Sequence, residues 1–533
     1  MRKTLVSILS FLLVAGFGAS AFAGHAADTG YEYTPKIVKA GKSNIDLSGS
    51  IRIRGDFRND TIDMYSGTAD QTANYDSRIR LLVKATVSPN TMGVIELESG
   101  LCSGTGDGES YGCPDGYDWG NGDTSEGTLG SYSEEYDFYQ YGNTKPTAMT
   151  IRQAYIAHQR VVAGVLSGVK AGHILTKLGN GVFYNHSKFG DDAIVLWTTP
   201  QKGTEISLTM AKLGEGHDNA EGYNGGDYEY AGNDDNTAYT LGVTTAAAGM
   251  NLGMDVTYLD NQDFTYDLRN DWRDSAGLHL WNIGLRADTT VSGIKLYGDV
   301  EIQTGKAESN YRPGSSREED RKFTGYAWLV GANLDVPNSP VSIGAEVGYG
   351  SGDKIADSYY SDGDYDDSQT GTKYEGFLTT IGTSGALGVR KTAFLYDDKV
   401  KNAACSLESS YTYGVSCSNA GIANTFYVNV GADADVTPAL NASLDIFYLR
   451  AAKGVNIMGA RETNGGPDRS KNLGVEVDAA ATYQLDTNLV YFVEAGYMFA
   501  GSAYNVPKED GNDGENHDAD NPYGIRHGLT LEF

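Results

Sequence analysis

Residues 523–533 at the end of the chain read YGIRHGLTLEF, and this stretch decides the fold. Apolar side chains recur at every second position, and only His527 interrupts them. Glycine and polar residues, among them Arg526 and Glu532, fill the alternate positions. A period of two predicts a strand with one apolar face and one polar face. Such a strand fits the wall of an outer-membrane β-barrel, whose lipid face is apolar and whose lumen face is polar.

The beginning of the chain predicts export across the inner membrane. Met1, Arg2 and Lys3 form a basic start, residues 5–17 are apolar or small, and Ala21-Phe22-Ala23 is a small-x-small cleavage site. These are the parts of a secretory signal peptide. We therefore expect a signal peptide at 1–23, a periplasmic N-terminal segment at 24–43, and a barrel domain at 44–533.

The composition agrees with a single large barrel. The 533 residues include 68 Gly and 36 Tyr but only 12 Pro, and the formal net charge is −29. Barrels are hydrophilic on average because only alternate strand residues meet lipid. Tyrosine suits the membrane–water interface, where its ring is half apolar and its hydroxyl is wet. No linker separates domains, and we expect no nucleic-acid partner.

Alternating segments recur along the whole chain. Short turns and long acidic connections separate them in alternation, as in barrel hairpins. We predict about eighteen strands, at 44–58, 74–88, 91–100, 147–160, 167–178, 191–200, 203–213, 237–248, 249–262, 276–290, 293–305, 322–336, 340–352, 423–437, 439–453, 471–485, 488–500 and 521–533. An even count places both ends on the periplasmic side. Residues 375–396 are assigned to a long external loop. Their weak apolar stretch could instead form an extra hairpin, so a total of sixteen or twenty strands stays open.

The strand number has functional weight because a barrel of this size leaves an aqueous channel. The sequence therefore predicts transport rather than catalysis. The connections 100–145 and 352–421 are long enough to fold inward and narrow the lumen.

Charged side chains fall in the register opposite the apolar one. A midplane arginine on the lipid face would cost about 2–4 kcal/mol, so these side chains are assigned to the lumen. The predicted pore-lining and substrate-binding residues are Arg52, Arg54, Arg58, Arg78, Arg80, Lys84, Glu96, Glu98, Arg152, Lys170, Arg286, Asp299, Glu301 and Arg526. The same register holds His158, Lys295, Glu476, Asp478 and Glu494.

Barrel closure brings most of these arginines together. The last strand lies beside the first, so Arg526 joins the arginines of the first two strands and Arg152 on one arc, while Asp299 and Glu301 lie far round the wall. Two interpretations stay open. The arc is a track for anions, which guanidinium groups match, or it is a structural ladder in which arginines pair with Glu96 and Glu98. Opposed charges would also create a transverse field.

The remaining motifs predict structure rather than chemistry. Cys102 with Cys113, and Cys405 with Cys417, are spaced as two loop disulfides of an oxidising compartment. The acidic runs 362–367 and 509–515 resemble fragments of calcium loops but lack the full EF-hand spacing. No haem, hydrolase or phosphate-loop motif is present, and the eight histidines are scattered. We expect no enzyme activity, no metal and no cofactor.

Several segments resemble a known family. They are IRQAYI at 151–156, GVKAGH at 168–173, residues 178–194, EVDAAATYQL at 476–485, EAGYMFAG at 494–501 and GIRHGLTLEF at 524–533. This chain is similar in them to the alginate-export family of outer-membrane porins. The resemblance implies an eighteen-stranded monomeric barrel whose Arg-rich lumen passes a polyuronate. It also implies that the terminal Phe533 contacts the barrel-assembly machinery.

These observations predict an all-β transmembrane barrel in the outer membrane of a Gram-negative bacterium, surrounded by lipid and lipopolysaccharide. Its expected function is a passive channel with an Arg-rich lumen that favours small anionic or sugar-acid solutes. One alternative is an exporter of an alginate-like polyuronate. Another is a scaffold barrel that sheathes a partner such as an electron carrier, which would supply its own haem.

Overall fold

The computed structural model is an antiparallel barrel closed by eighteen strands. It describes residues 36–40, 43–61, 64, 71–103, 128–129, 149–187, 190–214, 236–261, 277–307, 321–352, 373–379, 386–400, 421–455, 470–507 and 516–533. The predicted signal peptide lies outside these residues, as do the acidic runs 362–367 and 509–515. Of the four cysteines, only Cys102 lies within them, so both disulfides stay predictions.

The strands of the wall match the eighteen predicted ones. They are β2 (Ser43–Asn59), β3 (Thr72–Ser88), β4 (Thr91–Ser103), β6 (Met149–Val162), β7 (Val165–Ile174), β8 (Asp191–Gln201), β9 (Thr204–Gly214), β10 (Asn236–Ala247), β11 (Met250–Asn261), β12 (Leu278–Val291), β13 (Ile294–Ala307), β15 (Tyr326–Asp335), β16 (Val341–Gly350), β18 (Thr425–Thr437), β19 (Leu440–Val455), β20 (Ser470–Asp486), β21 (Leu489–Ala500) and β24 (Tyr523–Glu532).

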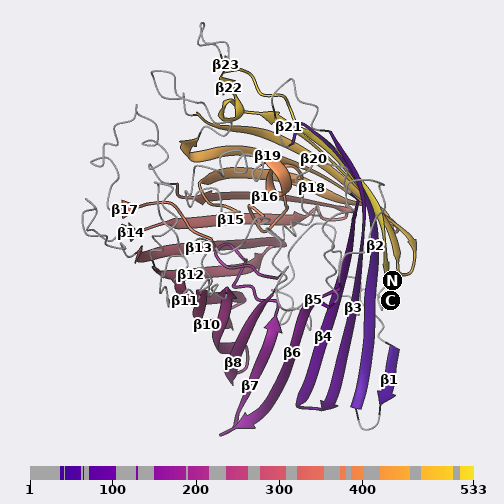
Figure 1. Cartoon of the computed structure of the whole chain (residues 1–533), viewed down its shortest axis with the longest axis vertical. Helices are drawn as coiled ribbons and strands as arrows, with labels where there is room; N and C mark the ends of the chain where they lie inside the picture. The colour runs from indigo at the N-terminus through magenta and orange to yellow at the C-terminus, as the bar shows by residue number, and fades with distance from the viewer. Residues whose placement is uncertain are drawn as a thin grey trace, which may run out of the picture.

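Each wall strand pairs with the next along the chain, and β24 closes the ring against β2 (Figure 1). The closing register aligns Ile53 with Leu529 and Asp56 with Arg526. Phe533 continues this ladder, because its backbone exchanges hydrogen bonds of 2.8 and 3.0 Å with Gly49. Arg526 therefore lies beside the first strand, as the sequence predicted. The contact of Phe533 with assembly machinery stays a prediction.

Tight turns join the strands at one end of the barrel. In Ala163-Gly164, Ala248-Gly249 and Ser292-Gly293 both residues have positive φ, between 50° and 84°. Two-residue turns of this kind match the twist of antiparallel strands. The strand ends that the longer connections join lie at the other end of the barrel, which is the extracellular end in barrels of this type.

An apolar belt surrounds the barrel. Outward positions carry large exposed side chains, such as Ile53, Ile302 and Val330, each more than half exposed. In β24, Ile525 and Leu529 are exposed while Gly524 and Gly528 are buried, so the predicted alternation is right. His527 lies outward in this row, with ring contacts to Tyr75 and Tyr491. Because a water-soluble wall would not expose such a belt, the barrel is embedded in a membrane.

A β-bulge corrects the predicted register of the fourth strand. The pairing of β4 with β6 shifts between Glu96 and Leu97, which places Arg152 in the bulge. After the bulge, along β6 toward its turn with β7, the side chains that point inward are those of Gln153 and Tyr155. His158, predicted to face the lumen, is instead exposed on the outer side, where its Nδ1 lies 2.8 Å from the Thr91 hydroxyl.

Short elements complete the description. They are β1 (Lys36–Ala40), β5 (Thr128–Leu129), β14 (Arg321–Phe323), β17 (Lys373–Tyr374), η3 (Tyr396–Val400), η4 (Ser502–Tyr504), β22 (Val506–Pro507) and β23 (Asn516–His517). Among the described residues of 375–396 there is no membrane-crossing hairpin, so their assignment to a loop is right. β1 pairs with the start of β2, within the segment predicted as periplasmic.

None of the helices in the described ranges has the length and apolarity to cross a membrane.

Candidate functional site

The arginines of β2 project into the lumen because side chains alternate along a strand. Arg52, Arg54 and Arg58 are all buried within the barrel. Neighbouring strands supply carboxylates at the same level. The Arg54 guanidinium lies 2.7 Å from Asp76 on β3. Arg52 Nη2 lies 3.9 Å from the same carboxylate.

Asp56 joins the two ends of the chain across the closing seam. It accepts hydrogen bonds from Arg58 Nε at 2.8 Å and from Arg526 Nε at 2.7 Å. Arg526 also lies 3.7 Å from Glu494 on β21. One carboxylate therefore ties the first strand to the last. The sequence placed the three residues of this seam in one register but did not single out Asp56 as the shared partner.

Glu96 and Glu98 on β4 pair with the arginines at the other end of the arc. Arg80 Nε lies 2.5 Å from Glu98, while Arg152 lies 2.9 Å from Glu96 and 3.5 Å from Glu98. Gln153 donates a further hydrogen bond to Glu96. These are the pairs that the structural interpretation of the arc predicted. We call this group the basic ladder: Arg52, Arg54, Arg58, Arg78, Arg80, Arg152 and Arg526 with Asp56, Asp76, Glu96, Glu98 and Glu494.

Two predicted lysines lie in the lumen register close to the basic ladder. Lys84 stands opposite Val94 in the β3–β4 register. Lys170 on β7 stands opposite Ala157, and its Nζ lies 4.0 Å above the ring centroid of Tyr155. A cation over a ring face is stabilised by the ring quadrupole. Lys170 is therefore held against the wall rather than extended toward the barrel axis.

Asp299, Glu301 and Arg286 form a second polar cluster on β12 and β13, as the register predicted. Arg286 makes a close contact with Asp255 on β11. Asn282 donates to Glu301 at 2.6 Å, and both groups are buried. Asp255 was missed, although it occupies the lumen register between the outward Met254 and Val256. The same alternation could have found it.

The connection between β7 and β8 folds into the lumen, which the sequence did not predict. It begins after Ile174, where the predicted strand continued to residue 178. Asn180 donates a hydrogen bond to Asp299 on the distant strand β13 at 2.9 Å, and Gly179 lies close to Arg286 on β12. Arg152 of the basic ladder donates to the Ser187 carbonyl at 3.0 Å. We call residues 175–187 the first inward segment.

Asp191 fixes the root of the first inward segment. Tyr184 donates its hydroxyl to Asp191 at 2.6 Å, His186 Nδ1 lies 2.6 Å away, and Thr176 donates at short range. Burial and the Asp191 carboxylate raise the pKa of Tyr184, so the phenol keeps its proton. Burial lowers the pKa of Lys177 to about 8, against the opposing influence of Asp299.

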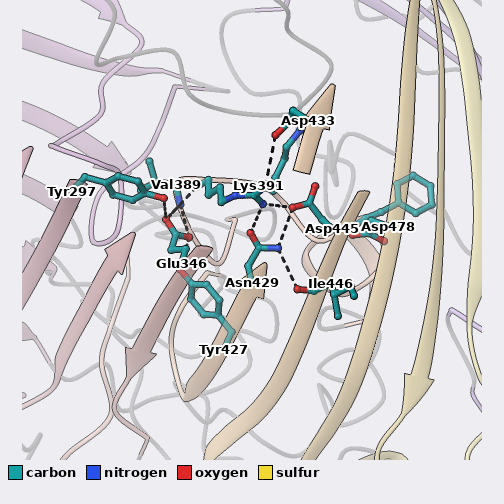
Figure 2. Close-up of polar contacts among 12 residues, drawn as sticks. Tyr297, Glu346, Val389, Lys391, Tyr427, Asn429, Asp433, Asp445, Ile446 and Asp478 are labelled. Atoms are coloured by element: carbon teal, nitrogen blue, oxygen red, sulfur yellow. Dashed lines mark hydrogen bonds and ion pairs between the residues drawn. The ribbon is translucent and has the colours of Figure 1, made fainter. Parts of the chain in front are cut away.

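A second inward segment, residues 386–400, covers the wall formed by β16 to β21. Glu346 on β16 accepts hydrogen bonds from Tyr297 at 2.7 Å and Tyr427 at 2.8 Å, and from the backbone N–H groups of Val389 and Arg390 (Figure 2). Arg390 donates to Asn429 at 2.6 Å and contacts Asp445 at short range. The sequence named the connection 352–421 as a candidate for inward folding, and residues 386–400 of it lie against lumen-facing side chains of the wall.

Two carboxylates of β20 anchor the far end of this segment. Glu476 accepts from the backbone N–H groups of Leu395 and Tyr396 at 2.6 and 3.0 Å, and Asp478 accepts from that of Phe394 at 3.0 Å. The Phe394 ring lies 4.9 Å from the guanidinium carbon of Arg58 and 5.1 Å from that of Arg526. Phe394 therefore joins the second inward segment to the basic ladder.

The two inward segments contact different parts of the wall. The first contacts β6, β12 and β13. The second contacts β16, β18, β19 and β20, and its Phe394 lies over Arg58 on β2 and Arg526 on β24. The other predicted inward connection, 100–145, is described at residues 100–103 and at β5, which extends the wall beside β6. Within the described ranges, His, Cys, Asp and Glu side chains form no group that could hold a metal ion.

Comparison with known proteins corrects the predicted family. No family model matches this chain, and no curated protein matches it in sequence. Similar solved structures are outer-membrane porins: OccK9 (OpdG) and OccK2 (OpdF) of Pseudomonas aeruginosa and OccAB1 of Acinetobacter baumannii. Their identities to this chain are 12%, 9% and 12%, with TM-scores of 0.47, 0.47 and 0.45. The matches cover 91%, 92% and 91% of this chain and 98%, 97% and 97% of those chains.

The resemblance to the alginate-export family is therefore wrong, because the similar structures are Occ porins and not alginate-export porins. The identities are too low to carry a solute from one chain to another. The closed up-and-down antiparallel barrel, its apolar belt and its division into tight turns and long connections are the marks of an outer-membrane barrel. The protein is a β-barrel of the Gram-negative outer membrane.

Proposed function

We propose that the protein is a passive diffusion channel whose lumen favours small anionic solutes, carboxylates and sugar acids among them. The observation that carries this proposal is the basic ladder. Its arginines outnumber the carboxylates that pair with them. Because the ladder spans adjacent strands, its excess positive charge is concentrated on one arc.

Pairing does not remove the attraction for anions. A guanidinium group has five donors in a planar fork, and one carboxylate uses only part of them. Arg80, Arg152 and Arg526 are each paired but keep between 11% and 15% of the side chain exposed. A permeating carboxylate can therefore share a guanidinium with its wall partner. The same pairs keep the arginines extended from the wall.

The opposite wall supports a transverse field. Asp255, Asp299 and Glu301 are buried on β11 and β13, and Arg286 is the guanidinium beside them. A solute crossing this level would meet positive charge on one side and negative charge on the other. Such a field orients polar solutes and disfavours apolar ones.

Planar-bilayer conductance of the purified barrel tests the proposal. We expect the reversal potential in a KCl gradient to show preference for chloride, and a small dicarboxylate to reduce the chloride current. The double variant Arg78→Gln/Arg80→Gln should lose much of this preference. Arg160→Gln is the matched control, because Arg160 lies on the outer side of β6. Cation preference in the wild-type channel would contradict the proposal.

The sheath alternative has no specific observation in its favour. Two inward segments already occupy part of the lumen, and a threaded partner would have to displace their buried anchors.

A further inference from the structure

One lumen-facing carboxylate is held between two cations of the second inward segment. Asp433 on β18 lies 2.8 Å from Lys391 Nζ through Oδ1 and 3.7 Å from Arg390 Nη2 through Oδ2. Each carboxylate oxygen therefore faces a different cation, which is how a bound carboxylate ligand would be held. Asp433, Asn429 and Asp445 converge on this part of the segment (Figure 2). None of these residues belongs to the basic ladder, and the proposed function does not use them.

Arg390 offers more donors than its partners use. Its Nη1 donates to Asn429 at 2.6 Å and contacts Asp445. Its Nε and Nη2 have no hydrogen-bond partner within the described ranges, although the side chain is only 3% exposed. The 3.7 Å from Nη2 to Asp433 is too long for a hydrogen bond. Because a buried donor without an acceptor costs free energy, an oxygen placed closer to Nη2 would be stabilised there.

Two hydroxyl groups flank the same position. Ser342 on β16 and Ser443 on β19 stand directly opposite Asp433 in the two strand registers. Directly opposite residues of paired strands share a face of the sheet, so both hydroxyls lie on the lumen side with the carboxylate. Each serine is partly exposed, and its hydroxyl can donate a hydrogen bond to an anion. Ammonium, guanidinium and hydroxyl donors together are groups that recognise a carboxylate.

The carboxylate is open to solutes from the periplasmic side. The side chains of Asp433 and Lys391 are 32% and 22% exposed. β18 ends at Thr437, four positions after Asp433, where a short turn leads to β19. Short turns lie at the periplasmic end of such barrels. Asn429, to which Arg390 donates, lies four positions further from this turn than Asp433 does. Asp433 therefore lies between the Arg390 guanidinium and the periplasmic mouth.

We propose that these donors form a second carboxylate-binding site of the lumen, and that the Asp433 side chain occupies it as an internal competitor. The site comprises Arg390, Lys391, Ser342 and Ser443. A permeating carboxylate binds there when it displaces Asp433, whose side chain then turns into the water of the lumen. A tethered competitor acts at a high effective concentration, so the site takes up solutes only when they are concentrated. Occupation by a solute rests on the proposed function, because small carboxylates must enter the lumen to reach the site.

Single-channel recording of the full-length barrel in planar bilayers tests the site, with succinate on both sides as the probe. Asp433→Asn keeps the shape of the side chain but removes its charge. We expect succinate to block this variant in events roughly 10-fold longer than in the wild type, because a charged competitor has been removed. Asp435→Asn is the matched control. Asp435 lies on the same face of β18 and accepts a hydrogen bond from Asn441 at 3.0 Å, so its loss should leave the length of the blocks unchanged.

A second variant tests the cation of the site. Lys391→Gln added to Asp433→Asn should return the blocks to the wild-type length, and heat-modifiable gel migration checks that each variant is folded. Three results would overturn the site: unchanged blocks in Asp433→Asn, equally long blocks in Asp435→Asn, or long blocks that persist without Lys391. The chloride preference of the wild type tests the proposed function separately. A wild type that prefers cations, together with long blocks in Asp433→Asn, would contradict the channel proposal and support the site.

Discussion

Two regions of the lumen wall use buried carboxylates in different ways. On β2, β3 and β4, Asp56, Asp76 and Glu98 face guanidinium groups of neighbouring strands. On β16 and β20, Glu346 and Glu476 face backbone N–H groups of the second inward segment. The first arrangement leaves a charged wall beside the channel, and the second fastens a loop across it. An acidic residue in the lumen register therefore does not by itself indicate whether it will pair with an arginine of the wall or anchor a loop.

The largest effect is expected where the loop-covered region loses a charge partner. Arg390→Ala leaves Asp445, whose side chain is 5% exposed, without the guanidinium it contacts. Removing one partner of a buried pair typically costs about 3–5 kcal/mol. We expect this loss in the unfolding free energy of the detergent-solubilised barrel, together with noisier conductance.

Lys391→Ala is the matched control for this experiment. Lys391 pairs with Asp433 at 2.8 Å, but its side chain is 22% exposed. Its loss should cost less than about 1 kcal/mol. Equal costs for the two variants would mean that the second inward segment is not held by buried charge.

The contact between the two regions should be the next most sensitive point. Phe394→Ala removes a buried ring that lies over Arg58 and Arg526, and such truncations cost about 3–5 kcal/mol in a packed core. We expect the loss in unfolding free energy to lie in the lower part of this range, because the ring lies beside charged groups. We also expect the single-channel conductance to rise. Phe394→Leu should retain most of the stability. Unchanged conductance in Phe394→Ala would show that the segment does not narrow the channel.

The charge of the basic ladder can be shifted in the opposite direction from the arginine variants. Glu96→Gln and Glu98→Gln remove negative charge while they keep the size of each side chain. The arginines beside them then have greater excess charge, so the reversal potential should move further toward that of chloride. A move toward cation preference would break the link between the ladder and selectivity. Glu205→Gln, on β9 outside the ladder, is the control.

A smaller effect is expected from the first inward segment as pH changes. Burial lowers the pKa of Lys177 to about 8. The ammonium is therefore charged below this pH and neutral above it, so anion preference should decline as pH rises through about 8. Lys177→Met should show the lower preference at all these pH values. A wild-type selectivity that is flat between pH 7 and pH 9 would contradict this role.

The strands could be predicted from the sequence because lipid enforces the alternation on every one of them. All eighteen predicted strands are present, and the pairing of Arg526 with the first strand follows from closure alone. The bulge at Arg152 shows where a period of two fails. One inserted residue reverses the faces beyond it, and nothing in the local sequence announces the insertion.

The inward segments could not be predicted in the same way, because non-local contacts hold them. Residues 175–178 continue an alternating pattern, yet the chain turns inward there since Asn180 and Gly179 find partners on β12 and β13. Arg390 lies in a connection without periodicity, so no sequence signal marked it. Glu346 and Asp255 did carry a signal, since both occupy the lumen register of an alternating strand.

The main-chain anchoring of residues 386–400 has a consequence for redesign. Glu346, Glu476 and Asp478 bind N–H groups that every residue other than proline provides. These hydrogen bonds are therefore independent of which side chains the segment carries at 389, 395 and 396, whereas the Phe394 ring is needed for the contact with Arg58 and Arg526. An engineer could replace exposed side chains near this scaffold to tune what passes the channel, while the carboxylates keep the loop in place. Evolution has the same freedom, and this barrel could acquire new solutes without a new fold.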